Sequence, residues 1–106
     1  MAAICTLLVV DEVRVVDNPA GRRYELWVGE SLAGLIHYRP RPGSLAFIHT
    51  EVYPEFEGHG LGGRLVADAL DDVRDRGLQV VPICPFTTSY IQRHPEYADL
   101  VVPSAD

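Results

Sequence analysis

EVYPEFEGHGLGGRLVADAL, residues 51–70, ends one structural pattern and begins another. Its first residues continue a series of short strands. Four glycines then fall within the six positions 58–63. From Leu61, apolar residues recur at helical spacing at positions 61, 65, 66, 69, 70 and 73. The stretch therefore predicts a strand that ends, a glycine-rich turn and an amphipathic helix, which Gly77 is placed to terminate.

The fold class follows from the patterns on either side. β-Branched or alternating runs predict strands over 13–16, 22–28, 32–38 and 45–52, and their short links favour an antiparallel meander. After the helix, 78–83 predicts a buried strand and 87–94 a short helix before Pro95. A helical crossover to the same sheet makes strands 45–52 and 78–83 parallel neighbours. We expect an α+β fold with a mixed sheet: a meander, a β-α-β crossover and a short C-terminal helix.

Length and composition bound the classes of function. The chain has 106 residues, which suits one domain over 13–106 with an N-terminal extension over 1–12. The net charge of −6 opposes general binding to nucleic acids or anionic membranes. The apolar run at 4–10 is too short to span a bilayer and makes a poor signal peptide, so we expect a cytoplasmic protein. The histidines and two cysteines lack metal-ligand spacings, so we expect no metal.

The glycine-rich turn admits several interpretations. GHGLGG matches the dinucleotide pattern G-x-G-x-x-G, but it follows a meander and leaves too few residues for a doubly wound sheet. A Walker loop would need Lys and Ser or Thr where Arg64 and Leu65 stand. A helix start with free N–H groups still favours a phosphate or pyrophosphate. The alternative is a tight strand-to-helix connection without a ligand.

A wider pattern around the turn resembles a known family. In the acyl-CoA-binding signature of the GNAT superfamily of N-acyltransferases, a strand ending in V-x-P precedes (Arg/Gln)-x-x-Gly-x-(Gly/Ala). Val52, Pro54, Gly60 and Gly62 match this signature, whereas Glu57 occupies the position of the Arg or Gln. From about 13 to 101 the chain resembles small stand-alone GNAT-like proteins, through the motifs at 49–54, 81–86 and 90–97.

The resemblance implies an enzyme of the GNAT N-acetyltransferase type. Acetyl-CoA would be the cosubstrate, and the acceptor would be an amine of a protein or a small molecule. The alternative is a CoA-binding module or partner subunit that catalyses little. The resemblance also implies CoA-binding residues around the turn, with the pyrophosphate on main-chain N–H groups: Val52, Glu57, Gly58, His59, Gly60, Leu61, Gly62, Gly63 and Arg64.

Four residues are candidates for the chemistry. Cys84 ends a strand between two prolines and would be an acyl acceptor or a small buried side chain. His49 and Glu51 lie two apart on a strand and so share a face, which we expect to carry Leu45 and Phe47 as well. Either could be a general base or a structural side chain. The resemblance gives Tyr90 the role of protonating the departing thiolate, against a simple packing role.

The chain is shorter than typical members of the superfamily. Those members place two helices between the first two strands, where this sequence has only the turn DNPAG, residues 17–21. These helices form much of the wall around the acceptor. We therefore expect an open acceptor side, which suits a large acceptor or a partner that completes the wall.

Overall fold

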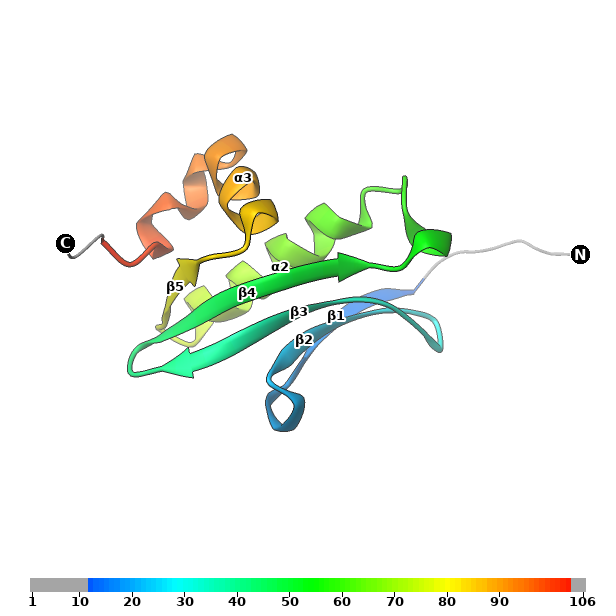
Figure 1. The fold of residues 1–106 in the computed structure, drawn as a ribbon, viewed down its shortest axis with the longest axis horizontal. Coiled ribbons are helices and arrows are strands. Elements are labelled where there is room, and N and C mark those ends of the chain that lie inside the picture. The colour runs from blue at the N-terminus through cyan, green and yellow to red at the C-terminus, as the bar shows by residue number, and fades with distance from the viewer. Residues whose placement is uncertain (1–11, 104–106) are drawn as a thin grey trace, which may run out of the picture.

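The structure, a computed structural model, describes residues 12–103. It consists of one sheet with two α-helices on the same side (Figure 1). The sheet order is β1-β2-β3-β4-β5. The strands are β1 (Val13–Asn18), β2 (Arg23–Val28), β3 (Ser31–Arg41), β4 (Ser44–Val52) and β5 (Gln79–Pro82), and the helices are α2 (Leu61–Asp75) and α3 (Pro85–Arg93). Short 3-10 helices occupy Pro19–Gly21, Pro54–Phe56 and Pro95–Leu100.

The predicted topology is confirmed. The first four strands pair antiparallel in sequence order, and β4 pairs parallel with β5 after the crossover through α2. Several boundaries differ from the expectation. β1 continues to Asn18, and β3 continues to Arg41, so the link before β4 is a tight hairpin turn at Pro42 and Gly43. α3 begins at Pro85 because proline suits the first helical position. Apart from Glu12, the expected extension over 1–12 lies outside the described residues.

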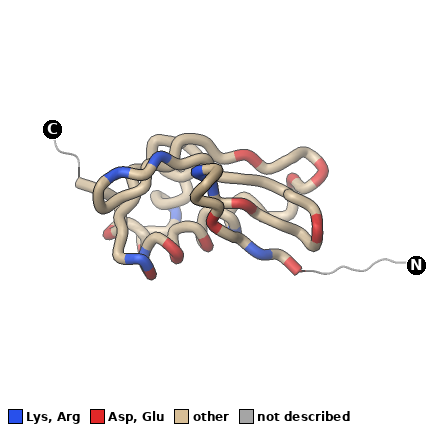
Figure 2. Tube along the Cα trace, turned by 90° about the horizontal axis from the view of Figure 1, so that it is seen from below, with Lys and Arg blue, Asp and Glu red and all other residues tan. Residues whose placement is uncertain are grey.

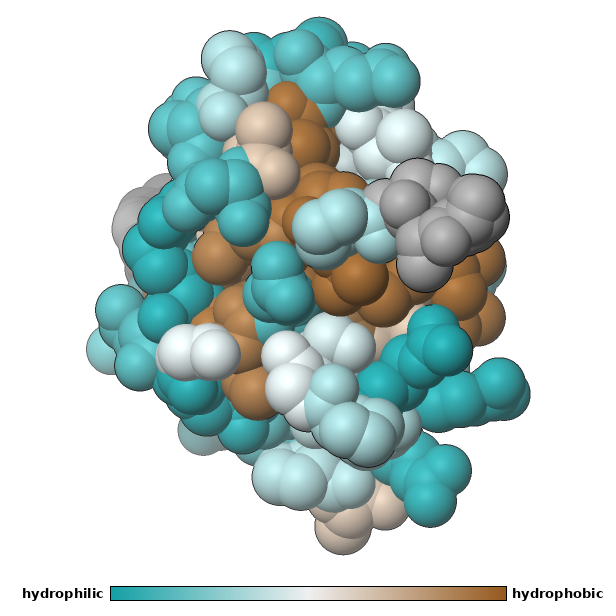
Figure 3. All heavy atoms as spheres, turned by 90° about the vertical axis from the view of Figure 1, so that its left-hand side faces the viewer, coloured by the Kyte–Doolittle hydropathy of each residue, from teal (hydrophilic) through white to brown (hydrophobic). Residues whose placement is uncertain are grey.

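The core lies between the sheet and α2. From Leu65 to Val73 the apolar stripe of α2 is fully buried against side chains of β2, β3 and β4, whereas Leu61 is partly buried. Each buried aliphatic side chain contributes about 1.5–3 kcal/mol relative to exposure. The free edge of β5 is partly covered, because Val80 bridges Val101 and accepts a hydrogen bond from the N–H of Val102 at 2.9 Å. At this end of the molecule, apolar side chains reach the surface between hydrophilic ones (Figure 3).

A β-bulge in β4 changes which side chains face the helices. His37 pairs with His49 and Tyr38 with Phe47, so Ile48 is an extra residue in β4. Phe47 is fully buried under the helices, whereas His49 is exposed. The expectation that His49 and Glu51 share the face of Leu45 and Phe47 is therefore wrong. The extra residue reverses the alternation and turns His49 and Glu51 to the open face, the side of the sheet without a helix.

A closed polar network ties the C-terminal half of α2 to the first three strands. The Tyr24 hydroxyl donates to Asp72 at 2.6 Å and accepts from Arg76 at 3.0 Å. Arg76 forms an i,i+4 ion pair with Asp72 at 3.1 Å and also contacts Asp17 at 3.0 Å. Burial, together with the hydrogen bond to Asp72, raises the pKa of Tyr24 well above its usual value. The hydroxyl therefore remains a donor over the physiological pH range.

We predict that Tyr24→Phe lowers the free energy of unfolding by about 1–2 kcal/mol, because it removes a hydrogen bond to a carboxylate and leaves the ring in place. Urea unfolding followed by tryptophan fluorescence measures the difference. Tyr53→Phe is the matched control, since the Tyr53 hydroxyl has no hydrogen-bond partner among residues 12–103. Equal stability of the two variants would contradict a stabilising network.

Candidate functional site

The two parallel strands part shortly after they meet. Their last paired residues are Phe47 and Pro82, and proline has no N–H to continue a ladder. The Phe47 carbonyl accepts two hydrogen bonds, from the N–H of Ile83 at 3.1 Å and from that of Cys84 at 2.9 Å. The chain then turns into α3 with Cys84 as the N-cap. Residues 48–52 of β4 are therefore left without a strand neighbour on this side, and their outward backbone groups can pair with a ligand.

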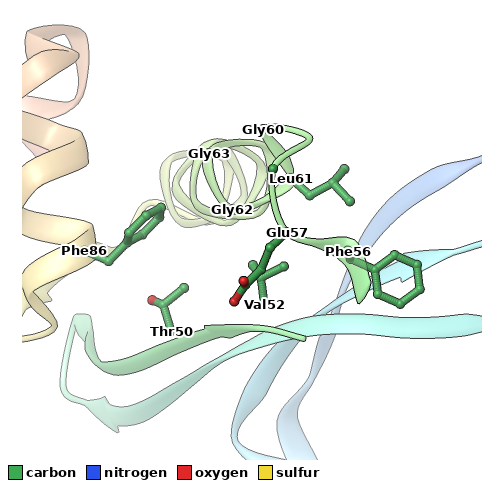
Figure 4. Close-up of a pocket in the computed structure, with 10 residues that line it drawn as sticks. Thr50, Val52, Phe56, Glu57, Gly60, Leu61, Gly62, Gly63 and Phe86 are labelled. Carbon is green, nitrogen blue, oxygen red and sulfur yellow. The ribbon is translucent and has the colours of Figure 1, made fainter. Parts of the chain in front are cut away.

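A cleft of about 380 Å³ lies over this unpaired part of β4. It runs between β4, the 3-10 turn after it, the start of α2 and the start of α3 (Figure 4). Its lining includes seven of the nine residues expected to bind CoA, and His59 and Arg64 are not among them. The lining residues are Thr50, Val52, Phe56, Glu57, Gly58, Gly60, Leu61, Gly62, Gly63 and Phe86.

The four glycines serve two purposes. Gly58 and Gly60 have φ angles of +84° and +73°, which L side chains rarely adopt. A Cβ on Gly62 would lie 3.0 Å from the Phe86 ring, and one on Gly63 would lie 3.5 Å from the Tyr90 ring. The first pair thus shapes the turn, and the second lets α3 approach α2. Gly60 caps α2 without a side-chain hydrogen bond, so the first N–H groups of the helix remain available.

The electrostatics of the cleft depend on the backbone. Among residues 12–103, Glu57 is the only charged residue in the lining, and its carboxylate extends into the space between the turn and β4 (Figure 4). Arg64 is held away by Asp68 at 2.7 Å and by the Val13 carbonyl at 3.2 Å. An anion in this cleft would therefore be held by N–H groups and the positive end of α2 rather than by a basic side chain.

Cys84 and Thr50 meet where the strands part. The buried Cys84 thiol donates to Thr50 Oγ1 at 3.4 Å. Burial raises the pKa of this thiol, but hydrogen bonds from the Thr50 hydroxyl and from the N–H groups of Thr87 and Phe86 stabilise the thiolate. The net result is a pKa below the usual value. The position and electrostatics of Cys84 thus suit a nucleophile at the end of the cleft.

The other three candidate catalytic residues lie apart from Cys84. The Tyr90 ring stacks on His94 with centroids 4.0 Å apart and packs near Gly63, outside the cleft lining. His49 Nε2 lies 3.5 Å from Glu51 Oε1, and both side chains are about half exposed on the open face. The structure therefore places Cys84 beside the cleft and the His49–Glu51 pair on the other side of β4.

Three lining residues were not among the nine that the sequence assigned to CoA binding. Thr50 was missed because the bulge at Ile48 turns it toward the helices, and a bulge has no signature in this strand. Phe86 was missed because its role depends on the angle at which α3 meets α2. Phe56 lies four residues after the end of β4. Its apolar side chain within an acidic turn was the signal from which its place in the cleft could have been predicted.

The fold and cleft define a class: acyltransferases that bind acyl-CoA between two parting strands beside a glycine-rich helix start. Residues 23–100 match the family model of the GCN5-related N-acetyl-transferases, and the chain belongs to this family. The activity of the class is acyl-CoA-dependent N-acetyl transfer, which makes the protein an enzyme of this type. No curated protein sequence matches the chain.

Solved structures show the same fold. A GCN5-like protein from Staphylococcus aureus aligns with a TM-score of 0.63 at 20% identity, over 86% of this chain and 87% of that one. An acetyltransferase from Bacillus subtilis, solved in complex with CoA, has a TM-score of 0.52 at 19% identity, over 77% and 72%. A ribosomal-protein-alanine N-acetyltransferase from Brucella melitensis has a TM-score of 0.50 at 16% identity, over 79% and 65%.

No helix within 12–103 is long and apolar enough to cross a membrane. In the same range, no group of three or more His, Cys, Asp or Glu side chains is arranged to hold a metal ion.

We predict that Glu57→Gln tightens acetyl-CoA binding about threefold to tenfold at low ionic strength, because it removes the one carboxylate in the lining. Isothermal titration calorimetry measures the change. Glu55→Gln is the matched control: it removes the same charge two residues away, at an exposed position outside the cleft. Equal effects of the two substitutions would indicate long-range electrostatics, and weaker binding by Glu57→Gln would contradict the expected repulsion.

We predict that Cys84 reacts with iodoacetamide as a thiolate at lower pH than an ordinary cysteine, whose pKa is about 8.5. A Cys5→Ser background leaves Cys84 as the only thiol. Thr50→Val should move the midpoint of the alkylation rate to higher pH, because the thiolate loses the hydroxyl donor. The urea-unfolded protein is the reference. If the alkylation midpoint of the native protein equals that of the unfolded protein, the fold does not stabilise the thiolate.

Proposed function

We propose that the protein transfers an acetyl group from acetyl-CoA to an amine through the cleft that joins the glycine-rich turn to Cys84. The observation that carries this proposal is the continuity of the cleft. One end is lined by the N–H-rich start of α2 and the other by Thr50 and Phe86. The Cys84 thiol is buried and does not line the cleft, but it contacts the Thr50 hydroxyl at 3.4 Å. This arrangement fits a ligand with a pyrophosphate at one end and a thioester at the other.

Acetyl-CoA would bind in an extended form along β4. Its pyrophosphate would lie on the main chain of residues 57–63, where the free N–H groups of α2 are. Its pantetheine arm would pair with the backbone of residues 48–52, which β5 leaves unpaired. The thioester would then reach the point where the strands part. The CoA complex of the Bacillus subtilis protein supports CoA binding in this fold.

Two routes of transfer are consistent with these positions. In the direct route, the neutral amine attacks the thioester carbon from the open face, and His49 or Glu51 takes its proton there, directly or through water. The CoA thiolate leaves toward Thr50 and Cys84, whose hydrogens can stabilise it. Tyr90 is poorly placed for this role, since its ring packs against α2 and His94.

In the covalent route, the Cys84 thiolate attacks the thioester carbon, and the CoA thiolate leaves and takes up a proton. The amine then attacks the S-acetyl group of Cys84. Its proton passes to a base, and the Cys84 thiolate is regenerated. The thiol pKa below the usual value supports this route.

A module that binds CoA with little catalysis is the second candidate. The short connection between β1 and β2 favours it, because the chain lacks the helices that wall the acceptor in longer members. We propose that the acceptor is a protein amine or a small molecule. We also propose a cytoplasmic location. The Brucella melitensis protein, a ribosomal-protein-alanine N-acetyltransferase, supports a protein acceptor.

We predict that incubation with acetyl-CoA adds one acetyl group to the intact chain and that an amine panel then drives release of free CoA. The chain contains no lysine, so side-chain amines cannot contribute the mass. The adduct should persist in Cys5→Ala and disappear in Cys84→Ala, and a thiol-reactive dye measures the release of CoA. Release that persists in Cys84→Ala without any adduct would contradict the covalent route and leave the direct one. Acetyl-CoA binding without release by any amine would contradict the enzyme and favour the module.

A further inference from the structure

Most of the arginines in the described residues have partners. Arg23, Arg64, Arg74 and Arg76 form ion pairs, Arg93 donates to Ser89, and Arg14 lies over the Trp27 ring. Within residues 12–103, three arginines have no ion pair, no side-chain hydrogen bond and no aromatic ring beneath them: Arg22, Arg39 and Arg41. Unpaired cations on a chain of net charge −6 indicate a surface for an anionic group.

These arginines lie at one end of the sheet. Arg39 and Arg41 are exposed on β3, opposite Ala46 and Ser44 of β4. Arg22 directly precedes the neighbouring strand β2, and its carbonyl accepts from the N–H of Tyr38 at 2.9 Å. Along the β3–β4 pair, Glu51 lies opposite Leu35, toward the other end from Arg39 and Arg41. In Figure 2, acidic residues predominate on the right, whereas arginines and acidic residues both occur on the left.

The basic residues continue from the point where β4 and β5 part. His37 pairs with His49 across the strands, and their rings stack with centroids 6.3 Å apart. His49 contacts Glu51, which lies toward the other end of the β3–β4 pair. Along β3, Arg39 and Arg41 follow His37 at alternate positions and so share its open face. The face thus presents a carboxylate and a histidine beside the proposed thioester position, and then two unpaired cations.

The distance between the charged side chains on this face limits the kind of ligand that can contact all of them. From His37 to Arg41 there are four residues of strand, which span about 13 Å. A free amino acid holds its amine and carboxylate only one carbon apart. It therefore cannot contact both the His49–Glu51 pair and the two arginines. An extended peptide covers the same span with about four residues. Ile48 and Ile83, which are 36% and 55% exposed beside the parting strands, add apolar surface for its first residues.

We propose that the acceptor is a peptide amine followed, three to five residues later, by acidic side chains that bind Arg39 and Arg41. The cationic amine would enter near Glu51 and His49, and the peptide would run along the open face of β3 and β4. This inference rests on the proposed function for its reaction, but the binding surface stands on the charges of the open face.

The test compares three peptides, two of them six residues long, each with a free N-terminus and a fluorophore at the other end. One peptide has Asp and Glu at its fourth and fifth positions, a second has Asn and Gln there, and a third is longer and has the acidic pair at its ninth and tenth positions. Fluorescence anisotropy in the presence of CoA measures binding, and release of CoA from acetyl-CoA measures transfer. Binding reports on the surface even if transfer fails.

We expect the first peptide to bind about fivefold to tenfold more tightly than the other two at low salt, with the preference shrinking as salt rises. The double substitution Arg39→Gln and Arg41→Gln should remove the preference and leave the affinity for the neutral peptide and for CoA unchanged. Arg93→Gln is the matched control, since it removes the same charge from α3, and it should retain the preference.

Equal binding of all three peptides, or a preference that survives the double substitution, would overturn the proposed acceptor class. Transfer to an unrelated amine with no peptide preference would also overturn the proposed acceptor class, but it would support the acetyltransferase activity. Selective binding without transfer to any amine would retain the surface and contradict the proposed reaction.

Discussion

The carbonyl of Phe47 decides where the sheet ends and the cleft begins. It accepts the N–H groups of both Ile83 and Cys84, while Pro82 has no N–H to continue the ladder. The parallel pair therefore stops after four residues, and β4 runs on for five more with one side unpaired. Unpaired backbone is costly in a core and useful beside a ligand. Everything proposed for the cleft, from the extended acetyl-CoA to the position of Cys84, depends on this early parting.

The start of α2 supplies the other half of the site. Gly58 and Gly60 form a turn that ordinary side chains would strain, and Gly62 and Gly63 let the rings of α3 pack against the helix start. We propose that the result is an anion site built from N–H groups, since the nearby Arg64 is bound elsewhere. Glu57 opposes an anion in the same cleft. An N–H-based site with an internal carboxylate would favour a ligand that also pairs with β4 over a simple phosphate.

Much of the fold could be predicted from the sequence, because local patterns determine it. The stripe from Leu61 to Val73, the glycines before it and the prolines around Cys84 each act within a few residues. The bulge at Ile48 could not be predicted, since it depends on how β4 pairs with β3, and it reversed the faces of Thr50 and His49. The burial of Glu25 is similar: its carboxylate accepts from Asn18, Arg23 and Trp27 on neighbouring positions of two strands. Side-chain contacts between elements were beyond the reach of sequence patterns.

The central claim is that acetyl-CoA lies along the unpaired part of β4, between the glycine-rich turn and Cys84. Amide chemical shifts of the ¹⁵N-labelled protein, recorded during titration with CoA, test it most directly. The account predicts changes confined to residues 48–52, to 57–64 and to the start of α3, with β1 and β2 unaffected. Changes that concentrate on β1 and β2, or that leave residues 57–64 unchanged at saturation, would contradict it.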